Sequence, residues 1–156
     1  MKEFLKAITM GACGALAVFT SFSLHWPTWV LFIAWVSYYL FGKSLRSALY
    51  ALIPITAGIL MGVIIQIFGG IFSKYLGAIG FSLAVFLLIT SLTYLSKIKW
   101  FSNIIAWFIG LIIFFGVHPH IEPKPILSLF IPIVAGISFA FINDTITSII
   151  SKEHKN

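Results

Sequence analysis

The sequence predicts an all-α integral membrane protein with six transmembrane helices, arranged as two inverted three-helix repeats whose second and fifth helices are shortened or broken. Three observations support this class. The 156-residue chain is 60% hydrophobic and only 9% charged, whereas a soluble domain carries about 25% charged residues. Its apolar runs are long enough to cross a lipid bilayer. The segment Ile53–Ile64 returns 78 residues later as Ile131–Ile142, with proline and glycine in register.

Two shorter matches extend this internal repeat. The sequence LAVF occurs at residues 16–19 and 83–86, and IAW occurs at residues 33–35 and 105–107. Three matches in the same order indicate one structural unit that is used twice. We therefore predict a single membrane domain, 1–156, with repeat one over 4–70, repeat two over 75–146 and a cytoplasmic tail over 147–156.

The first two spans differ in length. Span 1 is expected over about Phe4–Leu24, where Gly11 and Gly14 would let another helix approach closely. It lacks a small-residue cleavage site, so we interpret it as a span and not as a removable signal. Span 2, Trp29–Phe41, has 13 residues, which is about 20 Å against a hydrocarbon core of about 30 Å.

The next two spans are expected to be full length. Span 3 is predicted from Ser47 to about Phe68, and the turn after it is expected to contain Gly69, Gly70 and Lys74. Span 4 is predicted over Tyr75–Leu95.

The last two spans flank a polar segment. Span 5, Trp100–Phe115, is again short at 16 residues, and the segment VHPHIEPKP follows Gly116. The prolines of this segment are expected to hold it extended. Span 6 is predicted from Ile126 to about Ile142, before Asn143, Asp144 and an amphipathic end.

The basic residues indicate the orientation. Six spans place eight of the ten on one face of the membrane: Lys2, Lys6, Lys43, Arg46, Lys97, Lys99, Lys152 and Lys155. The other face receives Lys74 and Lys124. An excess of basic residues is typical of the cytoplasmic side, so both termini are predicted to be cytoplasmic.

The short spans supply the first pore-lining candidates. Each ends in an aromatic residue and a glycine, Phe41-Gly42 and Phe115-Gly116. Helices too short to cross leave backbone groups within the membrane, and these must be buried in protein or face water. We expect the two ends to approach a solute path from opposite faces. The alternative is that both helices tilt inward while the bilayer thins locally.

The long spans supply further candidates. Pro54 and Pro132 are expected to kink their helices or, if they lie in the first turn, to start them. The small-residue pairs Gly58/Gly62 and Gly136/Ala140 are expected to pack the halves or subunits together.

Gln66 and Asp144 occupy equivalent positions under the 78-residue offset. In the inverted arrangement they lie near opposite membrane faces. An ionisable group at the edge of a span is a functional candidate, so Asp144 and its equivalent Gln66 join the pore-lining set. The alternative for Asp144 is an interfacial position that caps or ends span 6.

The remaining candidates are weaker. His118, His120 and Glu122 would offer three metal ligands in an extended loop, but no fourth ligand is evident, and a solvated or pH-sensitive loop is favoured. We therefore predict no metal site. The single cysteine, Cys13, excludes an internal disulfide and is interpreted as a small packing residue.

The segment from Gly11 to Leu49 carries a family resemblance. A glycine-rich first span, Trp29 at the start of the second, Tyr38-Tyr39 near its end and Gly42-Lys43 after it resemble the small YcdZ-like bacterial inner-membrane proteins (DUF1097). The resemblance covers most of the chain. It implies a location in the bacterial inner membrane and no assigned activity.

The expected function is therefore a channel or transporter for a small neutral or weakly ionised solute. No nucleotide-binding or hydrolase motif is present, so transport would be passive or ion-coupled, without a cofactor, and no enzymatic activity or catalytic residue is expected. The expected partners are the bilayer, the solute and further copies of the chain, and not nucleic acid. The alternative is an accessory or scaffold protein that acts through helix–helix contacts.

Overall fold

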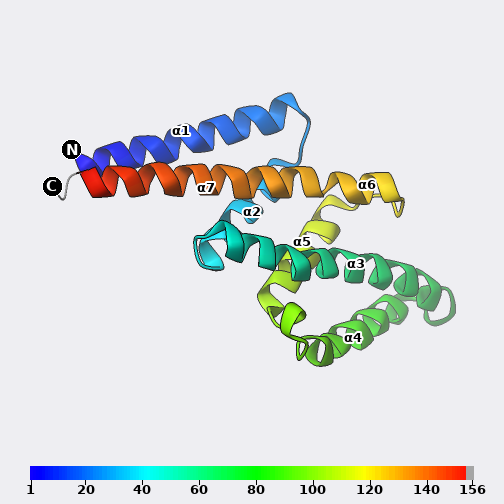
Figure 1. Cartoon of the computed structure of the whole chain (residues 1–156). Coiled ribbons are helices and arrows are strands. Elements are labelled where there is room, and N and C mark those ends of the chain that lie inside the picture. Colours follow the sequence, from blue (N-terminus) through cyan, green and yellow to red (C-terminus); the bar gives the residue numbers. More distant parts are fainter. Residues whose placement is uncertain (154–156) are drawn as a thin grey trace. The chain divides into compact units, whose positions relative to one another are not determined.

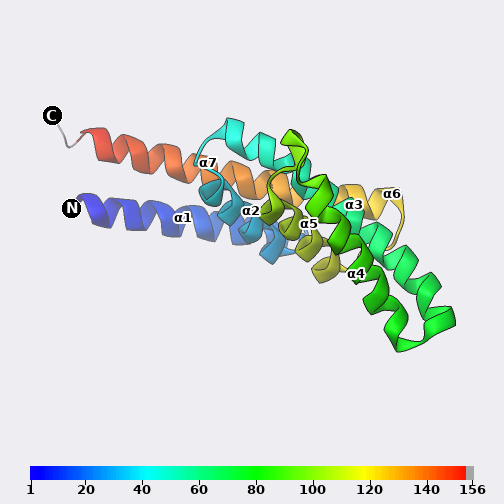
Figure 2. The same ribbon diagram turned by 90° about the horizontal axis from the view of Figure 1, so that it is seen from below.

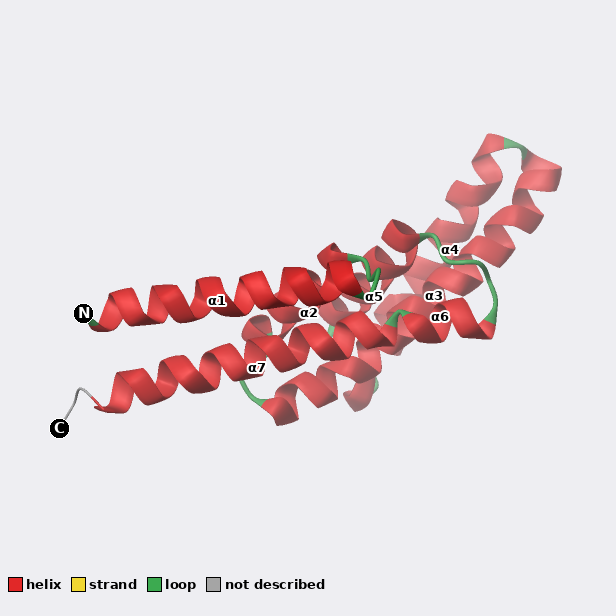
Figure 3. Cartoon of the chain, turned by 90° about the horizontal axis from the view of Figure 1, so that it is seen from above, coloured by secondary structure: helices red, strands yellow, loops and turns green. Residues whose placement is uncertain are grey.

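The computed structural model describes residues 1–153, and every regular element in that range is a helix (Figures 1 and 3). The elements are α1 (Lys2–Ser23), α2 (Thr28–Leu40), α3 (Leu45–Leu76), α4 (Ala78–Leu95), the 3-10 helix η1 (Lys99–Phe101), α5 (Ile104–Val117), α6 (Pro123–Ser128) and α7 (Phe130–Glu153). The all-helical prediction is confirmed. Lys155, counted above among the basic residues, and the end of the predicted tail lie outside the described range.

Four helical stretches are long and apolar enough to cross a membrane: Lys2–Ser23, Leu45–Leu76, Ala78–Leu95 and Pro123–Lys152. The helices α2 and α5 are apolar but shorter, with 13 and 14 residues. Large apolar side chains remain exposed, including Phe4 at 68%, Phe19 at 70% and Phe86 at 65%. Large exposed apolar side chains in this number suit lipid and not water. The chain is therefore a membrane protein.

The helices form two compact units. Unit 1 comprises Met1–Ala48 with Pro123–Asn156, and unit 2 comprises Leu49–Glu122. These units do not follow the consecutive segments 4–70 and 75–146. Each half of the chain instead supplies helices to both units.

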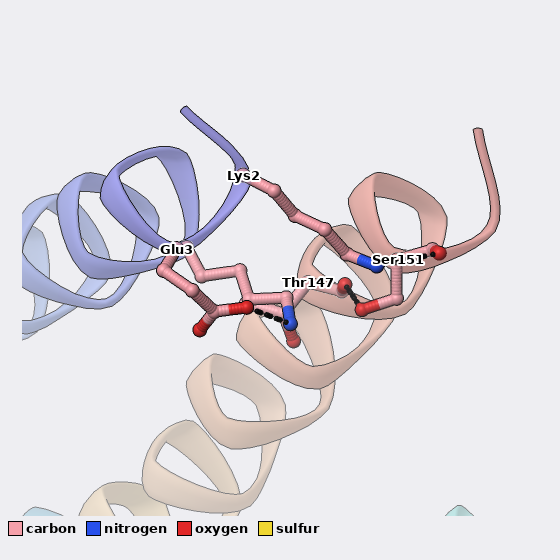
Figure 4. A network of polar contacts seen from close by, with 5 residues as sticks. Lys2, Glu3, Thr147 and Ser151 are labelled. Carbon is pink, nitrogen blue, oxygen red and sulfur yellow. Dashed lines mark hydrogen bonds and ion pairs between the residues drawn. The ribbon is translucent and has the colours of Figure 1, made fainter. Parts of the chain in front are cut away.

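In unit 1, α1 and α7 lie side by side and antiparallel (Figure 2). Small side chains of α1, namely Cys13, Ala17 and Ser21, are buried. The ends of the two helices are joined where Lys2 Nζ donates to the Ser151 carbonyl at 3.1 Å (Figure 4). The first turn of α1 and the last turns of α7 therefore lie at the same end of unit 1.

The packing face of α1 differs from the prediction. Gly11 and Gly14 have no atoms within 4 Å of an added Cβ, so neither provides a close helix contact in the described part of the chain. The buried stripe begins instead at Cys13, which packs as a small residue as predicted.

In unit 2, α3 and α4 form an antiparallel hairpin that turns at Gly77. A Cβ added at Gly69 would overlap the Phe81 ring, and a Cβ added at Gly80 would overlap the backbone of Phe72 and Ser73. The helix α5 packs on α3, and a buried cluster forms from Met61, Ile65, Leu92, Trp107 and Leu111. The Trp107 indole Nε1 donates to the Phe101 carbonyl at 2.9 Å.

The predicted turn at Gly69, Gly70 and Lys74 is wrong. All three residues are helical, and α3 continues to Leu76. The reversal falls at Gly77, whose φ of +59° is in the left-handed region that favours glycine. Gly69 serves the packing against Phe81, so its role is close approach and not chain reversal.

The predicted extended segment before span 6 is only partly correct. Residues 118–122 are not helical, but Pro123–Ser128 forms α6. The interruption between α6 and α7 falls at Leu129. Pro132 accounts for it, because proline has no N–H to donate to the Ser128 carbonyl one turn earlier. Pro132 thus lies in the first turn of α7, whereas Pro54 lies inside α3.

The end of α5 also differs from the prediction. Gly116 remains helical, and the chain turns at His118, which adopts the left-handed conformation with φ of 51°. Histidine is one of the non-glycine residues enriched in that region. At the end of α2, in contrast, Gly42 has a φ of +114° and turns the chain as expected.

Asn103 caps the N-terminus of α5, and its removal gives a local stability prediction. Its side-chain oxygen accepts a hydrogen bond from Ala106 N at 3.1 Å. Asn103→Ala is expected to lower the free energy of unfolding by about 1 kcal/mol. Thermal unfolding in detergent would measure this, with the exposed Ser102→Ala as the matched control. Equal melting temperatures for the two variants would contradict the capping role.

Candidate functional site

The helices α2 and α7 cross closely within unit 1 and run in the same direction. A Cβ added at Gly136 would overlap the Leu31 carbonyl and lie 2.9 Å from the Ala34 side chain. Further along, the Trp35 and Phe139 rings stack, with centroids 6.4 Å apart and an interplanar angle of 6°. This close approach brings the last turn of α2 against the middle of α7.

Four polar residues meet at this crossing. The Tyr38 hydroxyl donates to Asp144 Oδ2 at 3.1 Å, and Asn143 Nδ2 donates to the Tyr39 hydroxyl oxygen at 2.6 Å. The two tyrosine rings pack edge to face with centroids 5.5 Å apart. We refer to Tyr38, Tyr39, Asn143 and Asp144 as the α2–α7 polar cluster.

The cluster lies in an apolar setting. Tyr38 and Asn143 are only 2% and 3% exposed, and Phe141 packs edge to face on Tyr38. Asn143 Oδ1 is buried, and no hydrogen-bond donor of the described residues reaches it. A buried acceptor without a partner is unfavourable, so such an atom in a native structure calls for an explanation.

The charge of the cluster is also uncompensated. Asp144 is partly buried and forms no ion pair among residues 1–153. Lys43, which follows α2, lies with its Nζ 5.4 Å from the centroid of the Tyr39 ring. A carboxylate in an apolar helix is costly, and such groups commonly mark solute or ion pathways.

Asp144 neither caps nor ends the last helix. The helix α7 runs without a break to Glu153, so Asp144 lies in its interior. The hydroxyls of Thr147 and Ser151 donate to carbonyls of their own helix, which satisfies these polar side chains without ending the helix. The helix therefore continues beyond Ile142, the predicted end of span 6.

The other pore-lining candidates are divided between the two units. Phe41 and Gly42 follow α2 in unit 1, whereas Phe115 and Gly116 belong to α5 in unit 2. Phe115 packs edge to face on Phe114 and Phe81. Gln66 is partly buried within α3. Asp144 is the one pore-lining candidate that takes part in a polar cluster with residues of another helix.

The proline and glycine candidates lie in the helix crossings. Pro54 and Pro132 are buried. Gly58 and Gly62 of α3 lie against α5, the first at the Trp107 carbonyl and the second at the Phe114 ring. Gly136 lies against α2, and Ala140 is fully buried. In each unit these small residues place a helix from one half of the chain on a helix from the other half.

The loop candidates do not assemble a metal centre. No group of three His, Cys, Asp or Glu side chains suited to a metal ion occurs within the described range. His118 ends α5, and Glu122 precedes α6, with its N–H bonded to the His120 carbonyl at 2.8 Å.

Sequence reasoning did not assign Tyr38, Tyr39 or Asn143 to a site. The tyrosine pair entered only as part of the family resemblance, and Asn143 only as the residue after span 6. The available signal was chemical, because both pairs place hydrogen-bonding side chains inside apolar helices. What the sequence did not show is that α2 pairs with α7, more than 100 residues away.

A model of one protein family matches residues 7–148 of the chain, and its description is "Protein of unknown function (DUF1097)". No curated protein and no solved structure matches the chain significantly.

Proposed function

Given that the chain belongs to the DUF1097 family, whose description names no activity, we propose from its site that it is a channel or transporter for a small solute in the cytoplasmic membrane. The observation that carries this proposal is the α2–α7 polar cluster. It places the Asp144 carboxylate, which has no ion pair within residues 1–153, and the buried Asn143 amide in the interior of an apolar helix. Groups of this kind in membrane helices are expensive and commonly line solute or proton paths.

Matching burial in the two units supports the proposed repeat. Under the 78-residue offset, four buried residues of α3 pair with four buried residues of α7: Pro54, Ile55, Gly58 and Ile59 with Pro132, Ile133, Gly136 and Ile137. The glycine of each set lies against a short helix, α5 in one unit and α2 in the other.

The two shorter sequence matches behave in the same way. The LAVF match pairs α1 with α4 and aligns the buried residues Ala17 and Ala84. The IAW match pairs α2 with α5 and aligns Ala34-Trp35 with Ala106-Trp107, all of them buried. Unit 1 thus combines the first two helices of repeat one, α1 and α2, with the last helix of repeat two, α7. Unit 2 combines the first two helices of repeat two, α4 and α5, with the last helix of repeat one, α3.

This arrangement supports an inverted repeat. Three membrane segments per repeat reverse the second copy relative to the first, which is a common architecture among secondary transporters. In unit 1 the antiparallel α1 and α7 bring the start of α1 and the end of α7 to one end of the unit. That agrees with the proposal that both termini lie in the cytoplasm, on the side rich in lysine and arginine.

The short helices α2 and α5 are the proposed discontinuous elements of the solute path. A helix of 13 or 14 residues is about 20 Å long, less than the hydrocarbon core of about 30 Å. Its terminal backbone groups must then be buried in protein or face water. The scarcity of charge in both units favours a small neutral or weakly ionised solute.

Solute flux into proteoliposomes tests the proposal. With a panel of small amides, acids and alcohols, we expect flux of at least one solute above that of empty liposomes. Asp144→Asn is expected to lower this flux by about tenfold or more, because it removes the buried charge while retaining the side-chain shape. Glu3→Gln, which removes an exposed carboxylate near the N-terminus, is the matched control. No flux for any solute would contradict the proposal.

An accessory or scaffold role is the second candidate. It is favoured by the open apolar surface around Gly11 and Gly14, where an added Cβ meets nothing within 4 Å. Small residues on an exposed face allow close packing of a further helix, from a partner or from a second copy of the chain. Purification with a stoichiometric second protein would favour the scaffold role, whereas a homo-oligomer with solute flux would favour transport.

A further inference from the structure

We infer that the α2–α7 polar cluster binds a monovalent alkali cation, with Asp144 as the counter-charge and Asn143 Oδ1 as a neutral oxygen ligand. The binding site follows from the cluster itself. Its role as the site of a coupling ion rests on the proposed transport function.

The first step concerns the hydrogen bonds of Asn143. Its amide offers two N–H donors and one oxygen acceptor. The Nδ2 atom already donates to the Tyr39 hydroxyl at 2.6 Å, while Oδ1 is buried without a donor from residues 1–153. The partner that Oδ1 lacks must therefore be small, and it must carry either a positive charge or a donor hydrogen.

The second step concerns charge. Asp144, the next residue in α7, supplies one carboxylate, which accepts a hydrogen bond from Tyr38 and retains further lone pairs. Amide, carboxylate and phenol oxygens are hard ligands that suit alkali and alkaline-earth cations. One carboxylate balances one positive charge, whereas divalent ions are usually held by several carboxylates or by bound phosphates. The cluster therefore favours Na⁺ over Ca²⁺ or Mg²⁺.

The third step compares the two units. Under the 78-residue offset, Ile65 and Gln66 of α3 stand where Asn143 and Asp144 stand in α7. Ile65 is 1% exposed and belongs to an apolar cluster. The IAW match relates α2 to α5 with an offset of 72 residues. Under this offset, Gly110 and Leu111 stand where Tyr38 and Tyr39 stand in α2. Unit 2 thus has apolar residues in place of Asn143 and both tyrosines, and the uncharged Gln66 in place of Asp144. The crossing itself therefore requires neither the buried amide nor the charge of unit 1.

Equilibrium binding of radioactive Na⁺ to the purified full chain in detergent tests the inference. We expect one saturable site per chain. Asp144→Asn and Asn143→Leu are each expected to weaken binding by about tenfold or more, as loss of a metal-site partner commonly does. Glu3→Gln and Ser138→Ala are the matched controls, since the first removes an exposed carboxylate and the second an exposed hydroxyl of α7. Both are expected to bind Na⁺ like the unaltered chain.

Thermal unfolding of each variant without Na⁺ separates binding from folding. Weaker binding in variants that keep their melting temperature supports the site. If Asn143→Leu unfolds, Asp144→Asn alone decides, because its side chain has the same shape. Absence of saturable Na⁺ binding would overturn the inference and leave Asn143 Oδ1 to water. Na⁺ binding by both site variants that equals the binding by the unaltered chain would overturn it too. Na⁺ binding without solute flux would support the site while contradicting transport, so the two proposals fail separately.

Discussion

Gly58→Ala is expected to destabilise unit 2 by about 3 kcal/mol, at the upper end of the usual cost of overpacking. The added Cβ would overlap the carbonyl of Trp107 and crowd Gly110 of the same helix. Because these contacts are with backbone, no side-chain rotation relieves them, and α3 and α5 must move apart. Such a shift would also disturb the buried cluster that contains Met61 and Trp107.

Gly70→Ala is the matched control in the same helix. Gly70 has no atom within 4 Å of an added Cβ, so alanine is expected to stabilise α3 by about 0.5–1 kcal/mol through its helix propensity. Thermal unfolding in detergent measures both variants. Gly136→Ala, which meets the Leu31 carbonyl in unit 1, is expected to behave like Gly58→Ala. If all three variants melt together, the close helix crossings are wrong.

The helical class and the packing glycines could be predicted because they depend on local patterns. Long apolar runs with little charge predict membrane helices, and Gly58 and Gly136 stand in matching sequence contexts. Local patterns were less informative for helix ends. Gly69 and Gly70 looked like a turn, yet both are helical, and Gly69 packs against Phe81. A glycine serves equally well for a left-handed turn and for close helix approach, and only its neighbours distinguish the two.

The candidate site could be predicted only in part. Asp144 was selected because ionisable residues are rare in apolar helices. Its partner Tyr38 lies 106 residues earlier, and no local pattern indicates which helices pair over such a distance. The burial of Asn143 depends on the same pairing. A polar residue after an apolar run usually indicates the end of a helix. Here α7 continues, and the hydroxyls of Thr147 and Ser151 are satisfied by carbonyls of their own helix.

Each unit combines helices from both halves of the chain, so a cut between the halves is expected to have a large effect on folding. Unit 1 combines α1 and α2 with α7, and unit 2 combines α3 with α4 and α5. A cut at Gly77 therefore divides both units, since residues 1–76 lack α5 and α7, and residues 77–156 lack α2 and α3. Neither fragment can form the Tyr38–Asp144 contact or the cluster of Ile65 with Trp107.

Fragments 1–76 and 77–156 are therefore expected to be degraded when produced singly and to assemble when produced together. A tag on one fragment should retain the other in roughly equal amount after detergent extraction. Two changes, Gly58→Leu in the first fragment and Gly136→Leu in the second, are expected to abolish this retention, because each forces a large side chain into a backbone contact. The pair Gly11→Leu and Gly70→Leu, at glycines with open space around them, should leave retention intact. A stable, folded fragment 1–76 on its own would show that the consecutive halves fold separately, and that neither unit depends on a helix from the other half.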